Sequence, residues 1–352
     1  MLAKLFAKFS KDLGIDLGTS HTHIYVQERG VVINEPSIVA INARTDRIVA
    51  VGKEAEKMIG KTPPHIIISQ PLTRGVISDF EVTEKMLKHF IARVHEGSVM
   101  LLARPRVVIG IPLDITEVER KAVEDAMTSA GAREVYLVEK IMATAVGARL
   151  PIKEATGTML VDLGAGTNEI AVLSLDGVVT WKSLQTAGNE LTANIMQYVR
   201  DHFNLLLGEK LAENVKKKIG TTQVSEELME MKIRGRDLLS GLPREMTINE
   251  AQVRDAMHRS IRLIVEDIKA VLEVTPPELV ADIFERGMVL TGGGALLKGI
   301  DKTIAEATQI PVRIADDPST CVVRGTGIIL ENLDDYRDII IPPTQDIDKN
   351  FR

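Results

Sequence analysis

Cysteine, aromatic residues and long apolar runs are scarce in this sequence. One cysteine, Cys321, occurs among 352 residues, and aromatic residues make up 3%. A lone thiol excludes an internal disulfide and fits a reducing compartment, so we expect a buried, inert side chain. No apolar run approaches the roughly 20 residues that a membrane-spanning helix needs, and the N-terminal residues lack the features of a signal peptide. We therefore expect a cytoplasmic protein.

An excess of positive charge is also missing. The formal net charge is −6, and no recognisable nucleic-acid-binding motif is present. We therefore expect no nucleic-acid partner. Hydrophobic residues make up 45% of the chain, which is enough for a large core, and the length favours two domains over one.

The first eleven residues have an amphipathic pattern. Large apolar side chains fall on one face of a helix drawn through this segment: Leu2, Leu5, Phe6 and Phe9. Lysines fall on the opposite face: Lys4, Lys8 and Lys11. This pattern is typical of a short helix that lies in an anionic membrane surface, although a tail that packs on the protein or stays disordered has the same composition. Four apolar side chains bind only weakly, so membrane attachment favours a filament that presents many copies.

A second apolar patch has charged neighbours on both sides. Its residues are Val99, Met100, Leu101 and Leu102. They are interpreted either as a loop that dips into the membrane or as the edge of a core strand.

A strand–turn–strand pattern occurs twice, with an aspartate at the end of each first strand. One copy runs from Leu13 to Val26 around Asp16, and the other from Met159 to Leu173 around Asp162. The matching arrangement indicates an internal duplication.

Strands and helices alternate along the rest of the chain. We expect a strand over 107–111, a helix from near Thr116 to about Ala130, and a strongly helical stretch over 188–273. This alternation indicates mixed α/β layers. No low-complexity linker separates the two halves, so we expect them to pack against each other with a cleft between them.

The two turns have residues suited to holding phosphate. Glycine lets the backbone approach a ligand and adopt unusual φ/ψ angles, and Thr19, Ser20 and Thr167 add hydroxyl donors. Asp16 and Asp162 would then hold a hydrated Mg²⁺, which prefers a few carboxylates together with water and phosphate oxygens. One such hairpin is usually an ordinary glycine turn, but two matching copies favour phosphate binding.

A third glycine cluster follows the apolar run at 288–290. It consists of Gly292, Gly293, Gly294 and Ala295. Consecutive glycines leave a bare surface on which an adenosine ring could lie, although a flexible strand-to-helix turn has the same sequence.

The order of the motifs resembles the MreB family of bacterial actins, within the superfamily of actins, sugar kinases and heat-shock chaperones. The segments that carry the resemblance are 16–20 (DLGTS), 111–123, 162–172 (DLGAGTNEIAV), 187–220, 290–302 (LTGGGALLKGIDK) and 316–327. Together they span the chain from Asp12 to about Glu331.

The resemblance implies an actin-like α/β fold: two lobes of duplicated mixed-sheet-plus-helix domains, with ATP and Mg²⁺ in a central cleft. The implied subdomains are IA at 1–32, 80–146 and 316–352, IB at 33–79, IIA at 147–181 and 256–315, and IIB at 182–255.

The resemblance also implies the residues that contact the nucleotide. The first phosphate loop would contain Gly18, Thr19, Ser20 and His21, and the second Gly164, Ala165, Gly166 and Thr167. Gly188 and Asn189 would lie near the phosphates, Glu213 and Lys216 at the nucleoside, and Gly292 to Ala295 at the adenosine. Without the resemblance, Glu213 and Lys216 would be interpreted as a solvated helix face.

The sequence departs from the family at the position that orients the attacking water. The family has two adjacent glutamates there, whereas this chain has Glu139 followed by Lys140, in a register fixed by Met142 and Gly147. A charged lysine cannot accept a proton, and its ammonium would hold the γ-phosphate. We therefore expect slow or absent hydrolysis, with Thr167 retained as a water-positioning group. The alternative is that Glu139 takes over the missing role.

Smaller departures lie in the phosphate loops. His21 replaces a common asparagine, Ala165 replaces a glycine, and Asn189 replaces an aspartate. Ala165 would perturb affinity if its backbone needed a positive φ.

We predict an ATP-binding protein that polymerises into membrane-associated filaments controlling cell shape. Its expected partners are further copies of itself, an anionic membrane surface and membrane proteins. The alternatives are a nucleotide-dependent scaffold that does not polymerise and a small-molecule kinase. For the kinase, Asp114 is a candidate base, but it is more simply explained as the cap of the following helix.

Overall fold

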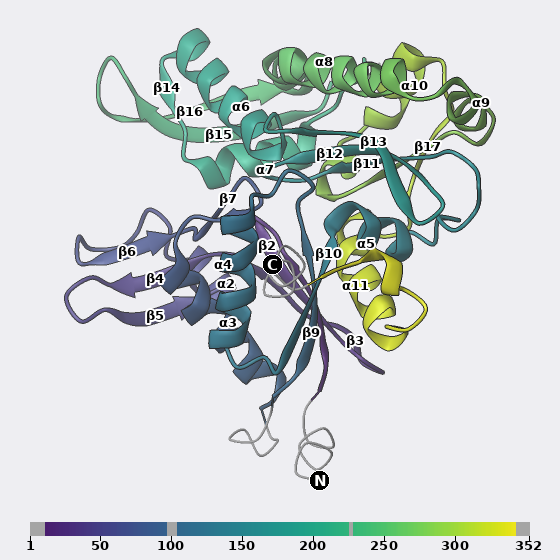
Figure 1. Cartoon of the computed structure of the whole chain (residues 1–352). Helices are drawn as coiled ribbons and strands as arrows, with labels where there is room; N and C mark the ends of the chain where they lie inside the picture. Colours follow the sequence, from purple (N-terminus) through teal and green to yellow (C-terminus); the bar gives the residue numbers. More distant parts are fainter. Residues whose placement is uncertain (1–10, 97–103, 225–227, 343–352) are drawn as a thin grey trace. The chain divides into compact units, whose positions relative to one another are not determined.

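The computed structural model describes residues 11–96, 104–224 and 228–342 (Figure 1). The chain divides into two compact units, residues 1–154 with 319–352 (unit 1) and residues 155–318 (unit 2). The apolar residues at 2–9 and 99–102 lie outside the described residues. The finer division into four subdomains stays a prediction.

A six-stranded mixed sheet forms the centre of unit 1. Its strands, in spatial order, are β19 (Ile340–Ile341), β10 (Glu134–Glu139), β9 (Arg106–Ile111), β1 (Leu13–Leu17), β2 (His21–Val26) and β3 (Gly30–Pro36). β1 is antiparallel to β2 but parallel to β9, and β9 is parallel to β10. The carboxyl ends of β1, β9 and β10 therefore meet at one edge of the sheet, where ligands bind in many α/β proteins.

Four longer helices accompany this sheet: α3 (Phe80–Val94), α4 (Glu117–Ser129), α5 (Lys140–Gly147) and α11 (Cys321–Glu331). The helix predicted from near Thr116 is confirmed as α4. Its N-cap is Thr116, which forms a reciprocal capping box with Glu119. The prediction that Asp114 caps this helix was wrong, because the Thr116 hydroxyl already accepts the Glu119 N–H.

α5 and α11 cross at very short distance and lie side by side in Figure 1. The crossing depends on two glycines, since a Cβ on Gly147 would overlap the Cys321 carbonyl and one on Gly325 would overlap the Ala143 carbonyl. Cys321 is fully buried, as predicted. The helix that makes this crossing, α5, begins with Lys140.

The remaining strands of unit 1 form small sheets. A three-stranded sheet contains β5 (Arg47–Val51), β4 (Val39–Asn42) and β6 (Ile66–Ser69), with the short helix α2 (Lys53–Glu56) beside it. A two-stranded sheet contains β7 (Leu72–Thr73) and β8 (Val76–Ile77).

Unit 2 has a five-stranded sheet that repeats part of the plan of unit 1. Its strands, in spatial order, are β13 (Gly177–Leu184), β12 (Asn168–Ser174), β11 (Thr158–Leu163), β17 (Met288–Thr291) and β18 (Val312–Ile314). β11 is antiparallel to β12 and parallel to β17, as β1 is to β2 and β9. The predicted duplication is therefore present in the strand pairing.

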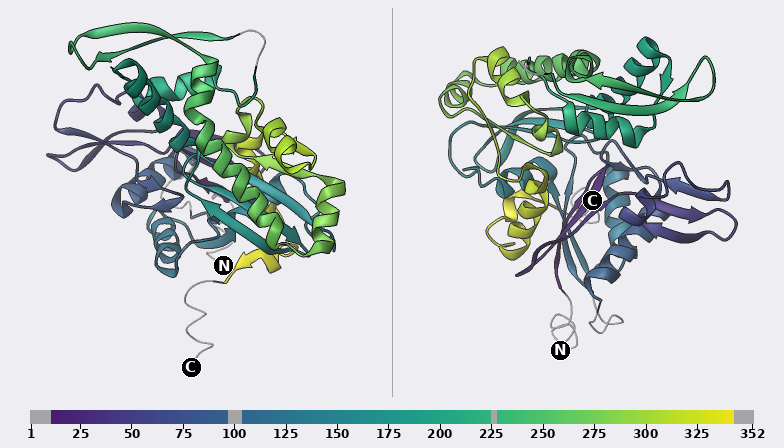
Figure 2. Two further views of the ribbon diagram at one scale, coloured as in Figure 1. Left: turned by 90° about the horizontal axis from the view of Figure 1, so that it is seen from above. Right: turned by 180° about the vertical axis from the view of Figure 1, so that it is seen from behind.

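The stretch 188–273 is only partly helical, which corrects the prediction for this region. It contains the helices α6 (Gly188–Phe203), α7 (Glu209–Ile219) and α8 (Glu250–Val274, ending just beyond it), and the strands β14 (Leu205–Leu206), β15 (Glu230–Asp237) and β16 (Pro243–Asn249). β14, β15 and β16 form a three-stranded sheet, in which β15 and β16 pair over their length as a long hairpin of unit 2 (Figure 2). Further along the chain lie α9 (Pro277–Arg286), the 3-10 turn η2 (Gly293–Leu296) and α10 (Ile300–Thr308).

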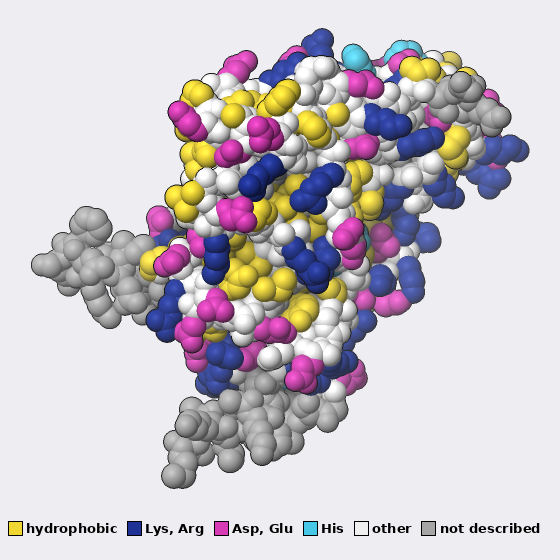
Figure 3. Space-filling view, turned by 90° about the vertical axis from the view of Figure 1, so that its right-hand side faces the viewer, with side chains coloured by type: hydrophobic (Ala, Val, Ile, Leu, Met, Phe, Trp, Pro, Cys, Tyr) yellow, Lys and Arg dark blue, Asp and Glu magenta, His cyan; other side chains and the backbone are white. Residues whose placement is uncertain are grey.

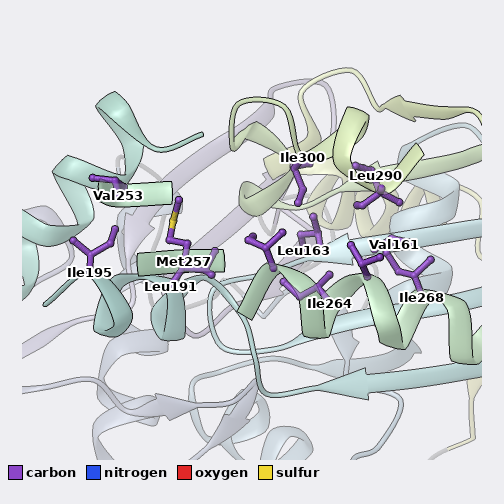
Figure 4. Close-up of a cluster of buried hydrophobic side chains, with 14 of the residues drawn as sticks. Val161, Leu163, Leu191, Ile195, Val253, Met257, Ile264, Ile268, Leu290 and Ile300 are labelled. Atoms are coloured by element: carbon purple, nitrogen blue, oxygen red, sulfur yellow. The ribbon is translucent and has the colours of Figure 1, made fainter. Parts of the chain in front are cut away.

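The hydrophobic core of unit 2 lies between its large sheet and helices α6, α8 and α10. Figure 4 shows side chains from each of these elements converging on it: Val161 and Leu163 from β11, Leu191 and Ile195 from α6, Val253, Met257, Ile264 and Ile268 from α8, Leu290 from β17 and Ile300 from α10. α8 thus packs a continuous apolar stripe inward, as the helical period requires. Among the described residues, no helix is both long and apolar enough to cross a membrane.

Candidate functional site

The first predicted phosphate loop is the hairpin between β1 and β2 in unit 1. It is closed by a hydrogen bond from the Gly18 N–H to the His21 carbonyl (3.1 Å). Gly18 does not have a positive φ, but a Cβ there would lie 2.7 Å from the same carbonyl. The glycine is therefore required by close packing of the turn rather than by an unusual backbone angle.

The hydroxyls of this hairpin already have partners within unit 1. Thr19 Oγ1 accepts the Gly75 N–H (2.8 Å), and Ser20 Oγ lies 2.9 Å from His21 Nδ1. Ser37 Oγ donates to the Gly18 carbonyl at 2.7 Å. These bonds hold the hairpin in a defined conformation before any ligand arrives.

Asp16 lies at the base of the hairpin and faces a histidine that the sequence analysis did not single out. Asp16 and His23 are opposite each other in the β1–β2 register, and His23 Nδ1 lies 3.2 Å from Asp16 Oδ2. Both residues are buried. The signal that could have revealed His23 is the alternation of the two strands, which places residues 16 and 23 on the same face.

Glu139 and Lys140 lie at the same sheet edge as Asp16. Glu139 ends β10 and Lys140 begins α5, and Gly110 of β9 pairs with Asp16 in register. A Cβ on Gly110 would lie 3.4 Å from the Lys140 Cα, so the lysine backbone packs directly on the strand beside Asp16. Burial raises the pKa of the Glu139 carboxyl. The structure therefore brings Asp16, Glu139 and Lys140 together within unit 1.

The second predicted phosphate loop, between β11 and β12 in unit 2, has the same closure as the first. The Gly164 N–H donates to the Thr167 carbonyl at 3.1 Å, matching the bond between Gly18 and His21. Neither Ala165 nor Gly166 has a positive φ. The extra methyl of Ala165 is therefore compatible with the backbone of this loop.

The N-terminus of α6 supports the second hairpin. The Gly188 N–H donates to the Gly164 carbonyl (3.0 Å), and the Asn189 N–H donates to the Ala165 carbonyl (2.8 Å). A Cβ on Gly188 would lie 3.2 Å from the Gly164 carbonyl oxygen, so the close approach favours glycine. These two predicted site residues thus hold the loop through their backbone.

Glu213 and Lys216 of α7 form a half-buried ion pair at 2.6 Å. Lys216 Nζ also donates to the Gly188 carbonyl (2.6 Å) and to Thr192 Oγ1 (2.9 Å). Burial alone would raise the pKa of Glu213, but the Lys216 ammonium and the Thr192 hydroxyl lower it overall. Burial lowers the pKa of Lys216, and Glu213 opposes this effect. The pair therefore does not lie on a solvated helix face. It contacts Gly188 at the start of α6 through Lys216.

The glycines after β17 have distinct packing roles. Gly292 has a φ of +77°, and a Cβ there would overlap the Leu163 carbonyl; a Cβ on Gly294 would lie 2.8 Å from the Leu163 Cβ. Gly293 has no neighbour within 4 Å of its Cβ position among the atoms of the described chain. Ala295 is fully buried. Of the four residues predicted to contact adenosine, only Gly293 leaves open surface. The other three pack the turn against β11.

The two aspartates differ in their accessibility to a metal ion. Asp16 is 8% exposed and Asp162 only 1%, and Asp162 Oδ1 accepts a hydrogen bond from Thr291 Oγ1 (3.2 Å). In the described part of the chain, no group of three or more His, Cys, Asp or Glu side chains could hold a metal ion by itself. Mg²⁺ does not need such a group, because it keeps several waters and binds through one or two carboxylates plus substrate phosphates. The residues present therefore fit a hydrated Mg²⁺, and Asp16 fits better than Asp162.

Comparison with known proteins gives the family of the chain. The sequence profile described as MreB/Mbl protein matches residues 10–338. The chain belongs to the MreB/Mbl family. Over 340 residues it is 48% identical to the cell shape-determining protein MreB of Escherichia coli K12, covering 95% of this chain and 97% of that protein. It is 45% identical over 326 residues to the cell shape-determining protein Mbl of Bacillus subtilis 168, covering 93% and 97%.

Solved structures place this MreB/Mbl chain in the actin-like fold, which confirms the predicted fold class. The crystal structure of Spiroplasma citri MreB5 bound to ADP matches with a TM-score of 0.88 at 36% identity, covering 94% of this chain and 98% of that one. The same protein bound to AMPPNP matches equally well. A MamK double helical filament, at 24% identity and a TM-score of 0.76, shares the fold.

Proposed function

We propose that this MreB/Mbl-family protein binds ATP with Mg²⁺ and polymerises into filaments that control cell shape at the membrane. The observation that carries the nucleotide part is the pair of matching hairpins. Each follows a strand that contains an aspartate near its end, and each is closed by a backbone hydrogen bond of 3.1 Å. Backbone N–H groups in such turns suit phosphate oxygens. The nucleotide-bound Spiroplasma relatives support this assignment.

Asp16 is the proposed contact to the hydrated Mg²⁺, since it is the more accessible of the two aspartates and lies at the base of a hairpin. The ion would neutralise phosphate charge when bound. Thr19, Ser20, Gly166 and Thr167 would hold the phosphates, and Gly293 would offer the open surface for the adenosine. The Glu213–Lys216 pair would contact the nucleoside.

Hydrolysis is proposed to be slow, because Lys140 replaces the glutamate that the family resemblance implies. The backbone of Lys140 packs on the strand beside Asp16, at the sheet edge where the first hairpin begins. A cation there stabilises bound phosphate but does not align a water. Glu139 precedes it, and its raised pKa reflects a buried environment rather than an activating partner.

Self-association is supported by large hydrophobic side chains exposed on unit 2. Val274 is 70% exposed and Phe284 61% exposed, at the end of α8 and within α9. On the face of the molecule in Figure 3, hydrophobic side chains are interspersed with both acidic and basic ones. Such mixed surfaces suit contacts between protein copies better than binding to a polyanion.

Membrane attachment is supported by the residues that flank the two apolar segments. The Lys11 N–H donates to His95 Nε2 (3.2 Å), and Lys11 Nζ donates to the Val94 carbonyl (3.3 Å). The Arg106 N–H donates to Asp12 Oδ1 (2.8 Å). The described residues that follow the first segment and flank the second are thus bonded to each other, and we propose that both apolar segments attach the filament to a membrane.

The test is high-speed pelleting of purified protein with Mg-ATP, Mg-ADP or no nucleotide, with negative-stain images of the pellets. We expect filaments favoured by ATP. A protein that binds no nucleotide, or that stays soluble over a wide concentration range in every nucleotide state, would contradict the proposal.

A further inference from the structure

The contact between His23 and Asp16 has a defined direction. A carboxylate can only accept hydrogen bonds, so the 3.2 Å contact requires His23 Nδ1–H to donate to Asp16 Oδ2. The two side chains face each other across an antiparallel pair and are 7% and 8% exposed. The ring of His21, two residues before His23, lies nearly parallel to that of His23 at 6.1 Å.

The two oxygens of Asp16 have different surroundings. Oδ2 faces His23, whereas Oδ1 lies 3.8 Å from the position of a Cβ on Gly18, in the hairpin turn. The terminal torsion of an aspartate is broad, so a free carboxylate would sample many orientations. A donor fixed in the neighbouring strand restricts that rotation and keeps Oδ1 toward the hairpin.

In the duplicated half of the chain, a different type of residue donates a hydrogen bond to the aspartate. In unit 2, Asp162 receives a hydrogen bond from Thr291, its register neighbour on the parallel strand β17. In unit 1 the corresponding neighbour of Asp16 on β9 is Gly110, which has no side chain and is covered by the Lys140 backbone. The donor to Asp16 therefore comes from the other neighbour, the antiparallel strand β2.

We propose that His23 is a positioning residue, which holds Asp16 Oδ2 so that Oδ1 is presented to a hydrated divalent cation at the first hairpin. The inference rests on the proposed function, because it assumes that Asp16 contacts the Mg²⁺ of Mg-ATP. Groups that hydrogen-bond to metal-binding side chains commonly change metal affinity by about 10- to 100-fold when they are removed.

The experiment measures the Mg²⁺ concentration that gives half-maximal binding of a fluorescent methylanthraniloyl-ATP to the full-length protein. His23→Leu removes the donor, whereas His23→Asn keeps an N–H close to the position of Nδ1. We expect His23→Leu to raise the half-maximal Mg²⁺ concentration by about 10-fold or more, and His23→Asn to stay within about 3-fold of wild type. Circular dichroism verifies that each variant is folded.

A double-mutant cycle with Asp16→Asn shows whether His23 acts through Asp16. In the Asp16→Asn background, His23→Leu should have no further effect on the Mg²⁺ dependence. An equal effect in both backgrounds, or no shift with His23→Leu in the wild-type background, overturns the inference. If His23→Leu does not fold, the comparison of His23→Asn with His23→Gln, whose longer side chain moves the donor, decides the same point. Wild-type protein that binds no nucleotide with Mg²⁺ would instead overturn the proposed function.

Discussion

Lys140 is the residue at which this chain departs most clearly from what its family resemblance implies. Lys140→Glu should restore a carboxylate that can align a water, so phosphate release should rise by about 10-fold or more. Lys140→Gln is the matched control, since it removes the ammonium without adding a carboxylate. Phosphate release is followed with a coupled assay in Mg-ATP. A brisk wild-type rate that Lys140→Glu fails to raise would defeat the hypothesis of slow hydrolysis.

Tyr25 gives unit 1 a measurable dependence on alkaline pH. Its hydroxyl donates to Glu331 of α11 (2.8 Å), and burial together with this carboxylate raises the pKa of Tyr25 to about 12. A raised pKa means that the stabilisation is complete below the unfolded pKa of about 10 and is lost as pH rises toward 12.

Tyr25→Phe should therefore lower the free energy of unfolding at pH 8 by only about 0.5–1 kcal/mol, because the bond is partly exposed and screened by solvent. The difference from wild type should shrink between pH 10 and pH 12. Urea unfolding at pH 8 and at pH 11 checks both points. A difference that stays constant between pH 8 and pH 11 would show that ionisation of the Tyr25 hydroxyl does not control this contribution to stability.

Sequence pattern found the aspartates and the glycines of the site but not His23. Asp16 and Asp162 stand out because the same motif occurs twice. His23 acquires its role only from the β1–β2 register, which pairs it with Asp16. Similarly, Gly292 and Gly294 look like bare surface in the sequence, whereas the structure packs both against Leu163. Roles that depend on a neighbour from another strand require the strand register in addition to the local sequence.

At the scale of single elements, a helix or strand could be predicted when the residues that define it lie close together in the sequence. α4 was predicted to within about a residue at each end, although its cap was placed at Asp114, whereas the cap is Thr116 in a capping box with Glu119. The β15–β16 pair was taken for helix. Its buried positions, such as Ile233 and Ile248, alternate with polar ones, but the strands lie between long helices and have many charged residues. The alternation that is typical of a strand was present in both segments, but their composition favoured a helix.

The crossing of α5 and α11 is an element-scale feature that a single methyl should disrupt. A Cβ on Gly147 would overlap the Cys321 carbonyl, which belongs to a backbone that cannot rotate away. Gly147→Ala should destabilise the protein by about 1–3 kcal/mol or more and lower ATP affinity, since α5 begins at Lys140.

Gly177→Ala is the control for this prediction. Gly177 also lacks a positive φ, and its Cβ position has no neighbour closer than 3.6 Å among the described atoms. The stability and the ATP affinity of the two variants are compared by thermal unfolding and by nucleotide titration. Equal melting temperatures for the two variants would show that the two helices can move apart at little cost.

At the scale of the whole molecule, polymerisation should depend on the exposed apolar residues of unit 2. Phe284→Asp places a charge at a side chain that is 61% exposed, so the monomer should stay folded. If α9 contacts another copy, the critical concentration for pelleting should rise by about 10-fold, equivalent to about 1.4 kcal/mol. Glu285→Gln, on the same helix, should leave it nearly unchanged. Normal pelleting by Phe284→Asp would exclude this part of α9 from the contact.

Membrane attachment should depend on both the N-terminal segment and the polymer. The four apolar side chains at 2–9 gain at most about 6–12 kcal/mol on transfer, against about 1–2 kcal/mol per residue for ordering the segment. One copy should therefore bind weakly, and a filament should bind through many copies at once. Full-length protein should co-sediment with anionic liposomes far better in Mg-ATP than in a state that does not polymerise.

Deletion of residues 1–10 should lower this co-sedimentation without lowering the yield of filaments pelleted in the absence of lipid. The deletion leaves Lys11 and its bond to His95 in place, so unit 1 keeps the contact between its first described residue and the end of α3. Neutral liposomes serve as the control, because the lysines of the segment should attract only anionic surfaces. If the deletion variant binds anionic liposomes as well as the full chain does, another surface holds the filament at the membrane, and residues 99–102 become the next segment to change.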